Sequence, residues 1–276
     1  MVGIGYRKDF SDEFWESNSL KPDFIEVAPE NWMEIGGFWK KHLKKARETY
    51  PLFCHGLSLS VGSPEGVDIN FVKKIKQFLE DFQVSLYSEH LTFSKVDNAH
   101  LYDLLPIPFT QDAINRVVDN IQQVQDLLGR RLILENGSYY TVLKAEMPEE
   151  DFINEIVKRS DCELLLDINN VYVNAFNHHY DAEKFISQMP LDKIKYIHMA
   201  GHLQVSENLI IDTHGSEIID PVYDLFKFTM KSLKRDIPVL LERDFNIPEL
   251  SVLQDEIDEL RTIKADTLKK FRNVAL

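Results

Sequence analysis

Six short apolar segments of this sequence each end in a histidine, an aspartate or a glutamate. In residues 164–167 (LLLD), the apolar run is typical of a fully buried strand, and a carboxylate stands where the strand ends. An ionised carboxylate in an apolar interior needs a cation or hydrogen bonds, so Asp167 is expected either to cap the strand end or to hold something positive. The other five segments end in His55, His90, Glu135, His198 and Glu242. The recurrence predicts a metal site.

Three more residues with ligand chemistry, Asn170, Asp212 and His214, are expected in loops beyond two of these strands. One octahedral ion takes about six ligands, some of them water, so nine candidates predict about two or three ions bridged by carboxylates. Ligands that are all nitrogen and oxygen, with many carboxylates, suit iron or manganese better than zinc. We expect the three loop residues to hold a third ion that is lost more easily than the others.

Each candidate also has a structural alternative when it is taken alone. A single histidine is more often a hydrogen-bonded core residue, and Asn170 or the pair Asp212 and His214 would fit a loop turn. Nucleophilic catalysis has less support, because the sequence has no Gly-x-Ser-x-Gly segment. Cys54 neighbours His55, but adjacent residues of a strand face opposite ways, so Cys54 is expected to pack as an inert residue.

The elements that must position these residues alternate along the chain. Apolar runs predict strands at residues 2–6, 24–28, 52–56, 84–91, 131–136, 163–168, 194–200 and 238–242. Helical periodicity and capping signals predict helices at residues 37–49, 67–82, 111–128, 149–159, 181–189, 220–234 and about 248–272. Eight strands that alternate with helices predict an α/β protein, a single (β/α)8 TIM barrel over residues 1–276. The last helix is expected to pack on the barrel. Residues between 92 and 110 are expected to be irregular.

Composition narrows the classes of partner. The formal charge is −14 over 276 residues, so nucleic acid is not expected to bind. No apolar run is long enough to cross a bilayer, and the first residues lack the layout of a signal peptide, which predicts a cytoplasmic protein. The two cysteines, Cys54 and Cys162, form no Cys-x-x-Cys pair, so thiolate metal sites and Fe–S clusters are not expected.

Several longer segments match one known family. From about residue 3 to 250 the sequence resembles the multinuclear non-haem iron-dependent oxidative enzymes, within the xylose isomerase-like TIM barrel superfamily. The matching segments are residues 24–32 (FIEVAPENW), 55–63 (HGLSLSVGS), 88–91 (SEHL), 134–136 (LEN), 166–170 (LDINN), 174–178 (NAFNH), 197–202 (IHMAGH) and 211–215 (IDTHG).

The resemblance implies a barrel with about two or three iron ions of mixed Fe(II)/Fe(III) state, and O2 as co-substrate. It implies oxidation of cysteine, or another residue, in a ribosomally made precursor peptide, and it leaves open the need for a partner protein that binds the leader peptide. The nine candidate ligands carry over, with the six strand-end residues as catalytic residues. Residues expected to support the ligands or contact the substrate are Arg7, Glu26, Asn31, His178, His202 and Asp244.

The sequence departs from the family pattern in two places. Arg243 stands where the family commonly has tryptophan, and Tyr139 and Tyr140 replace smaller residues, so the lining of the substrate channel is expected to differ. Two other functions stay open: a divalent-metal enzyme of the endonuclease IV or sugar isomerase type, and a non-catalytic, metal-stabilised scaffold that binds a peptide. The negative charge, and Asn170 where the endonucleases have histidine, argue against the nuclease.

Overall fold

The apolar runs predicted as strands form one closed parallel barrel in the computed structural model, which describes residues 1–17, 19–96 and 99–272. Around the barrel the order of strands is β1, β12, β9, β8, β7, β4, β3 and β2. Their bounds are β1 (Val2–Gly5), β2 (Ile25–Val27), β3 (Leu52–Gly56), β4 (Leu86–His90), β7 (Ile133–Glu135), β8 (Glu163–Asp167), β9 (Ile194–Met199) and β12 (Val239–Leu241). The predicted α/β barrel is therefore confirmed.

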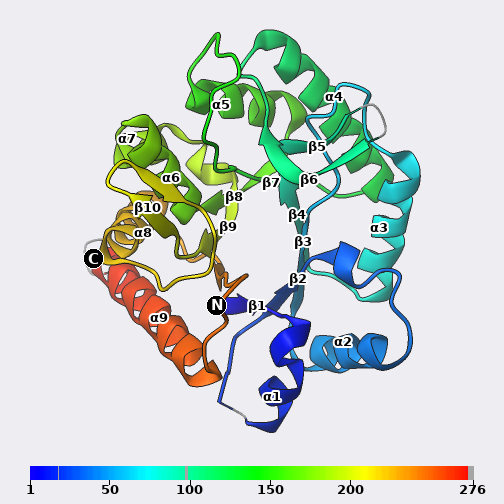
Figure 1. Cartoon of the computed structure of the whole chain (residues 1–276), viewed down its shortest axis with the longest axis vertical. Helices are drawn as coiled ribbons and strands as arrows, with labels where there is room; N and C mark the ends of the chain where they lie inside the picture. Colours follow the sequence, from blue (N-terminus) through cyan, green and yellow to red (C-terminus); the bar gives the residue numbers. More distant parts are fainter. Residues whose placement is uncertain (18, 97–98, 273–276) are drawn as a thin grey trace. The chain divides into compact units, whose positions relative to one another are not determined.

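Helices follow most of these strands (Figure 1). Those that match predicted helices are α2 (Gly37–Thr49), α3 (Ile69–Asp81), α4 (Gln111–Leu128), α5 (Glu149–Ser160), α7 (Ala182–Gln188), α8 (Asp220–Leu233) and α9 (Leu250–Arg272). Short helical segments are α1 (Ser11–Glu16), η1 (Lys8–Phe10), η2 (Pro29–Asn31) and η3 (Leu191–Lys193). No helix among the described residues combines the length and apolar character needed to cross a membrane.

Helix α4 shows how local sequence sets these boundaries. The Thr110 hydroxyl accepts a hydrogen bond from the Ala113 N–H at 3.2 Å and so caps the first turn. Gly129 follows the last turn with φ of 71°, a left-handed conformation that glycine adopts without steric cost. Between them the apolar residues, Val117 and Val124 among them, recur at helical spacing and are fully buried.

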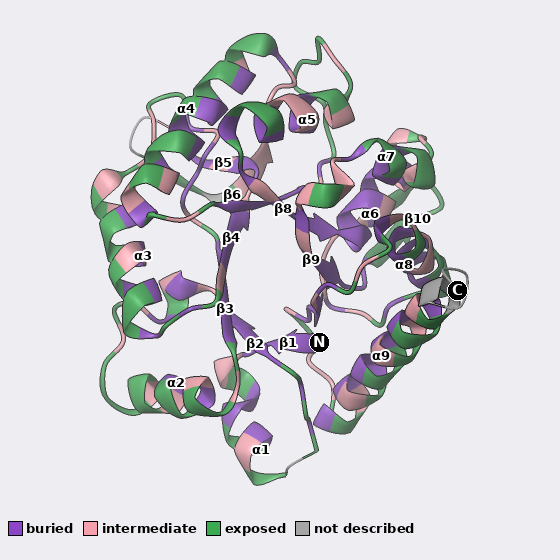
Figure 2. Ribbon diagram, turned by 180° about the vertical axis from the view of Figure 1, so that it is seen from behind, coloured by how far each residue is buried: buried purple, intermediate pink, exposed green. Residues whose placement is uncertain are grey.

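The chain divides into two compact units. The first unit comprises Met1–Glu26 and Leu166–Leu276, and the second comprises Val27–Leu165. Within the second unit, helices α3, α4 and α5 each have one buried side, and their other sides are mostly exposed (Figure 2). Within the first unit, α9 packs against α8 and β1 (Figure 1). The expectation of one domain stays a prediction.

Three features differ from the sequence expectation. The stretch expected to be irregular contains an antiparallel pair, β5 (Thr92–Val96) and β6 (Ala99–Pro106). A second antiparallel hairpin, β10 (Leu203–Ser206) and β11 (Leu209–Ile211), lies between β9 and α8. Residues after β8 form a helix, α6 (Ile168–His178). Its buried residues, asparagines included, lie on most of its circumference, so it has no amphipathic period for the sequence to reveal.

Arg243, one of the departures from the family pattern, takes part in a buried ion pair. Its Nη2 lies 2.8 Å from Oε2 and 3.0 Å from Oε1 of Glu256 on α9, and both residues are buried. The position is thus filled by an arginine whose charge is neutralised by the last helix. The pair ties the segment after β12 to α9 within the first unit.

Replacing Glu256 by alanine is expected to lower the free energy of unfolding by about 3–5 kcal/mol, because it leaves the buried Arg243 guanidinium unpaired. Urea denaturation followed by circular dichroism measures the change. The matched control is Glu259→Ala, at an exposed position of the same helix, which is expected to change stability by less than about 0.5 kcal/mol. Equal effects of the two substitutions would contradict the stabilising role of the pair.

Candidate metal centre

The second unit contains a group of three candidate ligands, His55, His90 and Glu135, whose donor atoms all lie within 4.8 Å of one another. Glu135 Oε2 lies 2.8 Å from His55 Nε2 and 3.2 Å from His90 Nε2. The register of the parallel strands places His90 beside Glu135, at the ends of β4 and β7. The sequence pattern of residues at strand ends thus becomes a cluster through strand pairing.

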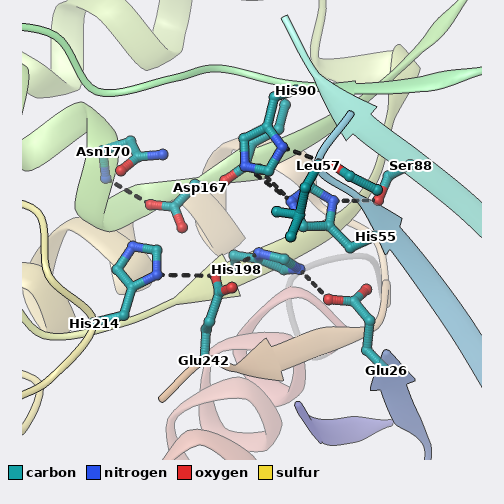
Figure 3. A network of polar contacts seen from close by, with 12 residues as sticks. Glu26, His55, Leu57, Ser88, His90, Asp167, Asn170, His198, His214 and Glu242 are labelled. Atoms are coloured by element: carbon teal, nitrogen blue, oxygen red, sulfur yellow. Dashed lines mark hydrogen bonds and ion pairs between the residues drawn. The ribbon is translucent and has the colours of Figure 1, made fainter. Parts of the chain in front are cut away.

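The outer nitrogen of each imidazole in this group is held by a polar partner. His55 Nδ1 lies 2.7 Å from Ser88 Oγ, and His90 Nδ1 donates to the Gly56 carbonyl at 2.9 Å (Figure 3). A carbonyl only accepts, so Nδ1 of His90 carries hydrogen and Nε2 of the neutral ring is the nitrogen that can bind a metal. This fixed tautomer and ring orientation is typical of histidine ligands.

Two carboxyl groups missed by the sequence analysis, the buried Glu89 and the half-buried Glu30, hold the segment after β3. Glu30 Oε1 accepts from the N–H groups of Leu57 and Ser58, at 2.8 and 3.0 Å. Glu89 Oε1 accepts from the Leu59 N–H at 3.1 Å, and burial raises its pKa to about 8. Glu89 is next to His90 in the same strand, so the two side chains point to opposite faces. The sequence alone could therefore have indicated that Glu89 does not point the same way as the candidate ligand His90.

The first unit contains a second group of three candidates, Asp167, His214 and Glu242, with donor atoms within 4.8 Å of one another. Glu242 Oε2 lies 3.4 Å from His214 Nδ1 and 2.9 Å from Nδ1 of His198 (Figure 3). His214 Nε2 in turn lies 2.7 Å from Asp212 Oδ1. His214 has φ of 51°, a strained conformation for a residue with a side chain, as is common at functional sites.

Glu26, expected to support a ligand, lies on the far side of the His198 ring. His198 Nε2 is 3.0 Å from Glu26 Oε1, and the Tyr196 hydroxyl donates to Glu26 Oε2 at 2.8 Å. Burial alone lowers the pKa of His198, but Glu26 and Glu242 together raise it well above its ordinary value. A carboxylate behind an imidazole raises the basicity of the ring as a ligand, and a metal at Nδ1 would replace the proton there.

Asp167 caps a helix and is also a candidate ligand. Its Oδ1 accepts from the Asn170 N–H at 2.6 Å and caps α6, and the same fully buried carboxylate belongs to the second group of candidates. Asn170 lies in the first turn of α6, so the expectation that it sits in a loop was wrong. His214 groups with Asp167 and Glu242, whereas the sequence analysis assigned it to a separate third site.

Asn169, which the sequence analysis did not single out, links two of its candidates. Its Oδ1 lies 2.8 Å from His202 Nδ1, and its Nδ2 donates to Asp212 Oδ1 at 2.7 Å. The His202 ring stacks on Tyr172 with centroids 5.3 Å apart. Burial lowers the pKa of His202, which favours the neutral ring.

The remaining predicted contacts divide into two kinds. Arg7 is bonded to Asp244 and lies 3.8 Å from Glu242 Oε1, and Asp244 Oδ2 lies 3.3 Å from His214 Nδ1. Both therefore support the second group. Asn31 is exposed in η2, and His178 is partly exposed at the end of α6, and neither belongs to a candidate metal group among the described residues.

The donor atoms fit a metal ion. Within the described residues, Glu242 Oε2 and His214 Nε2 are buried and take part in no hydrogen bond, although each lies within 2.9 Å of another donor or acceptor. Close approach without hydrogen-bond geometry is expected when lone pairs point at a shared cation. Imidazole and carboxylate ligands suit iron, manganese or zinc.

A recess beside the end of β7, within the second unit, contains a further acidic residue, which is half-buried. Its lining includes Ile107, Phe109, Asn136, Tyr139, Glu149 and Phe152. Tyr139, the second departure from the family pattern, donates from its hydroxyl to Glu149 Oε2 at 2.9 Å. Burial raises the pKa of Glu149 to about 8, so this carboxyl group is protonated at neutral pH. Tyr140, in contrast, is exposed.

These observations define a class: a parallel α/β barrel with histidine and carboxylate clusters at its strand ends. The chain belongs to the family described as RiPP precursor modification enzyme MbnB/TglH/ChrH, whose model matches residues 1–265. The match confirms the resemblance found in the sequence. The family description places the chain among enzymes that modify precursors of RiPPs, peptides that are made on the ribosome and then modified.

Similar proteins and structures agree with this assignment. The chain is 51% identical over 263 residues to a UPF0276 protein of Acinetobacter baylyi, which covers 95% of this chain and 91% of that protein. A UPF0276 protein of Shewanella sediminis is 51% identical over 259 residues, covering 94% and 92%.

Solved structures with the same fold include an L-ribulose 3-epimerase, with a TM-score of 0.65, 13% identity and coverage of 99% and 96% of the two chains. D-psicose 3-epimerase of Clostridium cellulolyticum H10 has a TM-score of 0.58, 12% identity and coverage of 99% and 98%. At this identity the likeness concerns the fold alone.

The raised pKa of the half-buried Glu149 predicts a pH-dependent stability. The folded protein keeps the proton up to about pH 8, whereas the unfolded chain releases it near the ordinary value of 4.5. The contribution of Glu149 therefore falls as pH rises between these values, by at most about 1.4 kcal/mol per pH unit. Glu149→Gln keeps an acceptor for Tyr139 but cannot titrate. Between about pH 5 and 9, its free energy of unfolding is expected to fall less than that of the original protein. Urea unfolding at each pH gives the free energy of unfolding of both proteins. The same change with pH in both proteins would contradict this prediction.

Glu26→Gln is expected to weaken metal binding in the first unit by about 10–100-fold, because the neutral amide no longer polarises the His198 ring. Competition titration with a chromophoric chelator measures the affinity. Tyr196→Phe, which removes only the hydroxyl that bonds to Glu26, serves as the matched control and is expected to have a smaller effect. Unchanged affinity in Glu26→Gln would show that the carboxylate does not support a ligand.

Proposed function

We propose that this protein is a multinuclear non-haem iron oxidase that uses O2 to modify cysteine, or another residue, in a ribosomally synthesised precursor peptide. The observation that carries the proposal is the pair of buried ligand groups, His55, His90 and Glu135 in one unit and Asp167, His214 and Glu242 in the other. Family membership supplies the substrate class. The ligand types support a redox metal with nitrogen and oxygen ligands.

The number of donors supports more than one ion. Each group offers three ligands by itself, and His198 and Asp212 lie within 2.9 Å of members of the second group. A single octahedral ion takes about six ligands, so this set exceeds its needs when water also binds. Carboxylates can bridge neighbouring ions, which hydroxyls and amides do poorly. We therefore propose about two to three iron ions for each chain.

Iron, when bound, supplies Lewis acidity that favours a substrate thiolate and one-electron chemistry for the reaction with O2. The chain's own residues prepare the site. Gly56 fixes the tautomer of His90, and Glu26 holds the ring of His198. Arg7, bonded to Asp244 and 3.8 Å from Glu242, adds positive charge beside the carboxylates. Burial of the ligands limits access of water to them.

Other functions remain as alternatives that experiment separates. The structural likeness to sugar epimerases makes a divalent-metal isomerase the second candidate, although a shared fold does not imply a shared activity. A zinc-dependent nuclease and a metal-stabilised peptide-binding scaffold are further candidates. Consumption of O2 with a change in the mass of a peptide distinguishes the oxidase from all of them. A partner protein that binds the leader peptide is part of the proposal only if the peptide is not modified by this chain alone.

Protein purified without oxygen is expected to contain about two to three iron ions per chain, because the ligands exceed one octahedral site. Elemental analysis and O2 uptake with a cysteine-containing precursor peptide are the measurements.

Glu135→Ala and His198→Ala are each expected to lose metal and turnover while circular dichroism stays unchanged, since the apolar strand residues hold the barrel. His100→Ala, at an exposed position of β6, is the control. Stoichiometric zinc without iron, or full turnover in both ligand variants, would overturn the proposal.

A further inference from the structure

The hairpin β10–β11 lies outside the barrel sheet and joins two segments of the candidate metal centre. The residue before it is His202 and the residue after it is Asp212. Asn169 bonds to both of these side chains, at 2.8 and 2.7 Å, so the base of the hairpin is anchored next to the second ligand group. A molecule bound along the hairpin would therefore lie beside His202 and Asp212.

One edge of this hairpin is closed by a side chain that imitates a strand. Asn177 of α6 donates from Nδ2 to the Ile210 carbonyl at 2.9 Å, and its Oδ1 accepts from the Ile210 N–H at 3.1 Å. The backbone groups of Ile210 hence point away from β10. Ile210 therefore belongs to a non-hydrogen-bonded pair, in which both opposed residues direct their backbone N–H and C=O groups away from the partner strand. Its register partner is Gln204, whose backbone groups accordingly point away from β11.

Among the described residues, no further strand pairs with the other edge, which β10 forms. All four of its residues are exposed, and Leu203 and Val205 keep 50% and 52% of their surface accessible. Natural edge strands are usually covered, short, bulged or protected by lysine or proline. β10 has no lysine or proline, but it is four residues long and its register shifts between Gln204 and Ser206, so Gln204 is the residue available for pairing. A two-stranded hairpin gains stability from a third strand. The hairpin carries one charged residue, Glu207, so backbone hydrogen bonds and apolar contact are its means of recognition.

We propose that β10 is the docking edge for an extended segment of the precursor peptide, which adds to the hairpin as a third strand. This inference rests on the proposed function, because the family's peptide substrates supply the occupant. The peptide backbone pairs with Gln204, and its apolar side chains contact Leu203 and Val205. Strand addition at this place holds the rest of the peptide near the base of the hairpin, where His202 and Asp212 lie. Binding through such contacts is expected to depend little on salt.

The test uses one substitution that removes a backbone donor and one that keeps it. Gln204→Pro removes the outward N–H, and Gln204→Ala loses the same side chain but keeps that N–H. The probe is a synthetic, cysteine-containing precursor peptide that carries an N-terminal fluorophore. Fluorescence anisotropy with the iron-loaded protein, without oxygen, gives the dissociation constants. Gln204→Pro is expected to bind at least about tenfold more weakly, and Gln204→Ala within about twofold of the original protein.

A second arm leaves the protein unchanged. A peptide methylated on alternate backbone nitrogens, with the same side chains, is expected to lose affinity in the same way because it can no longer donate to a strand edge. Hydrogen exchange of residues 203–206 is expected to slow when the unmodified peptide binds. Equal affinities of the two Gln204 variants, together with unchanged hydrogen exchange, would overturn the inference.

The remaining outcomes separate this inference from the proposed function. If the protein oxidises the peptide and Gln204→Pro binds it normally, docking at β10 is wrong and the oxidase stands. If Gln204→Pro alone loses binding but no oxidation occurs, docking stands and the oxidase is wrong. If the original protein does not bind the peptide, β10 is not a peptide-docking edge and the inference is overturned. If the protein forms a concentration-dependent dimer that only Gln204→Pro abolishes, the edge binds a second copy of the chain, which also overturns the inference.

Discussion

Buried carboxylates and imidazoles in close contact are the constraint on which the rest of this structure depends. Asp167 and His198 are fully buried, and Glu135 and Glu242 are nearly so. Removing such groups from water costs several kcal/mol for each ion, at least about 3, unless charges and hydrogen bonds compensate them. Their neighbours supply part of that compensation, and a bound cation would supply the rest. The site is therefore stable only as a set.

The surrounding residues serve this set. Ser88 and the Gly56 carbonyl orient the histidines of the second unit, and Glu26 orients His198 in the first. Glu30 and Glu89 fix the backbone of residues 57–59, which follows directly after a ligand strand. Rigid ligands keep their geometry when a metal or substrate binds, because little conformational entropy remains to be lost.

The departures from the family pattern are accommodated by new partners. Arg243 is neutralised by Glu256 on α9, and Tyr139 bonds to the half-buried Glu149 in the recess beside β7. Both Arg243 and Tyr139 are buried, and each has a specific polar partner, as buried polar groups require.

The sequence by itself determined the barrel, because eight apolar runs separated by helical patterns have few ways to bury their surfaces. It also predicted the residues that form the candidate metal groups, because a polar residue at the end of a buried strand can be recognised from the sequence alone. It could not reveal α6, whose buried asparagines hide the helical period, or the two hairpins, whose pairing is not encoded in one strand. Only the tertiary structure decided that His214 groups with Asp167 and Glu242, that Glu26 supports His198 and that Asn177 closes one edge of β11. The physical reason is that such partners lie far apart in sequence, and only strand register and helix packing bring their atoms within hydrogen-bonding distance.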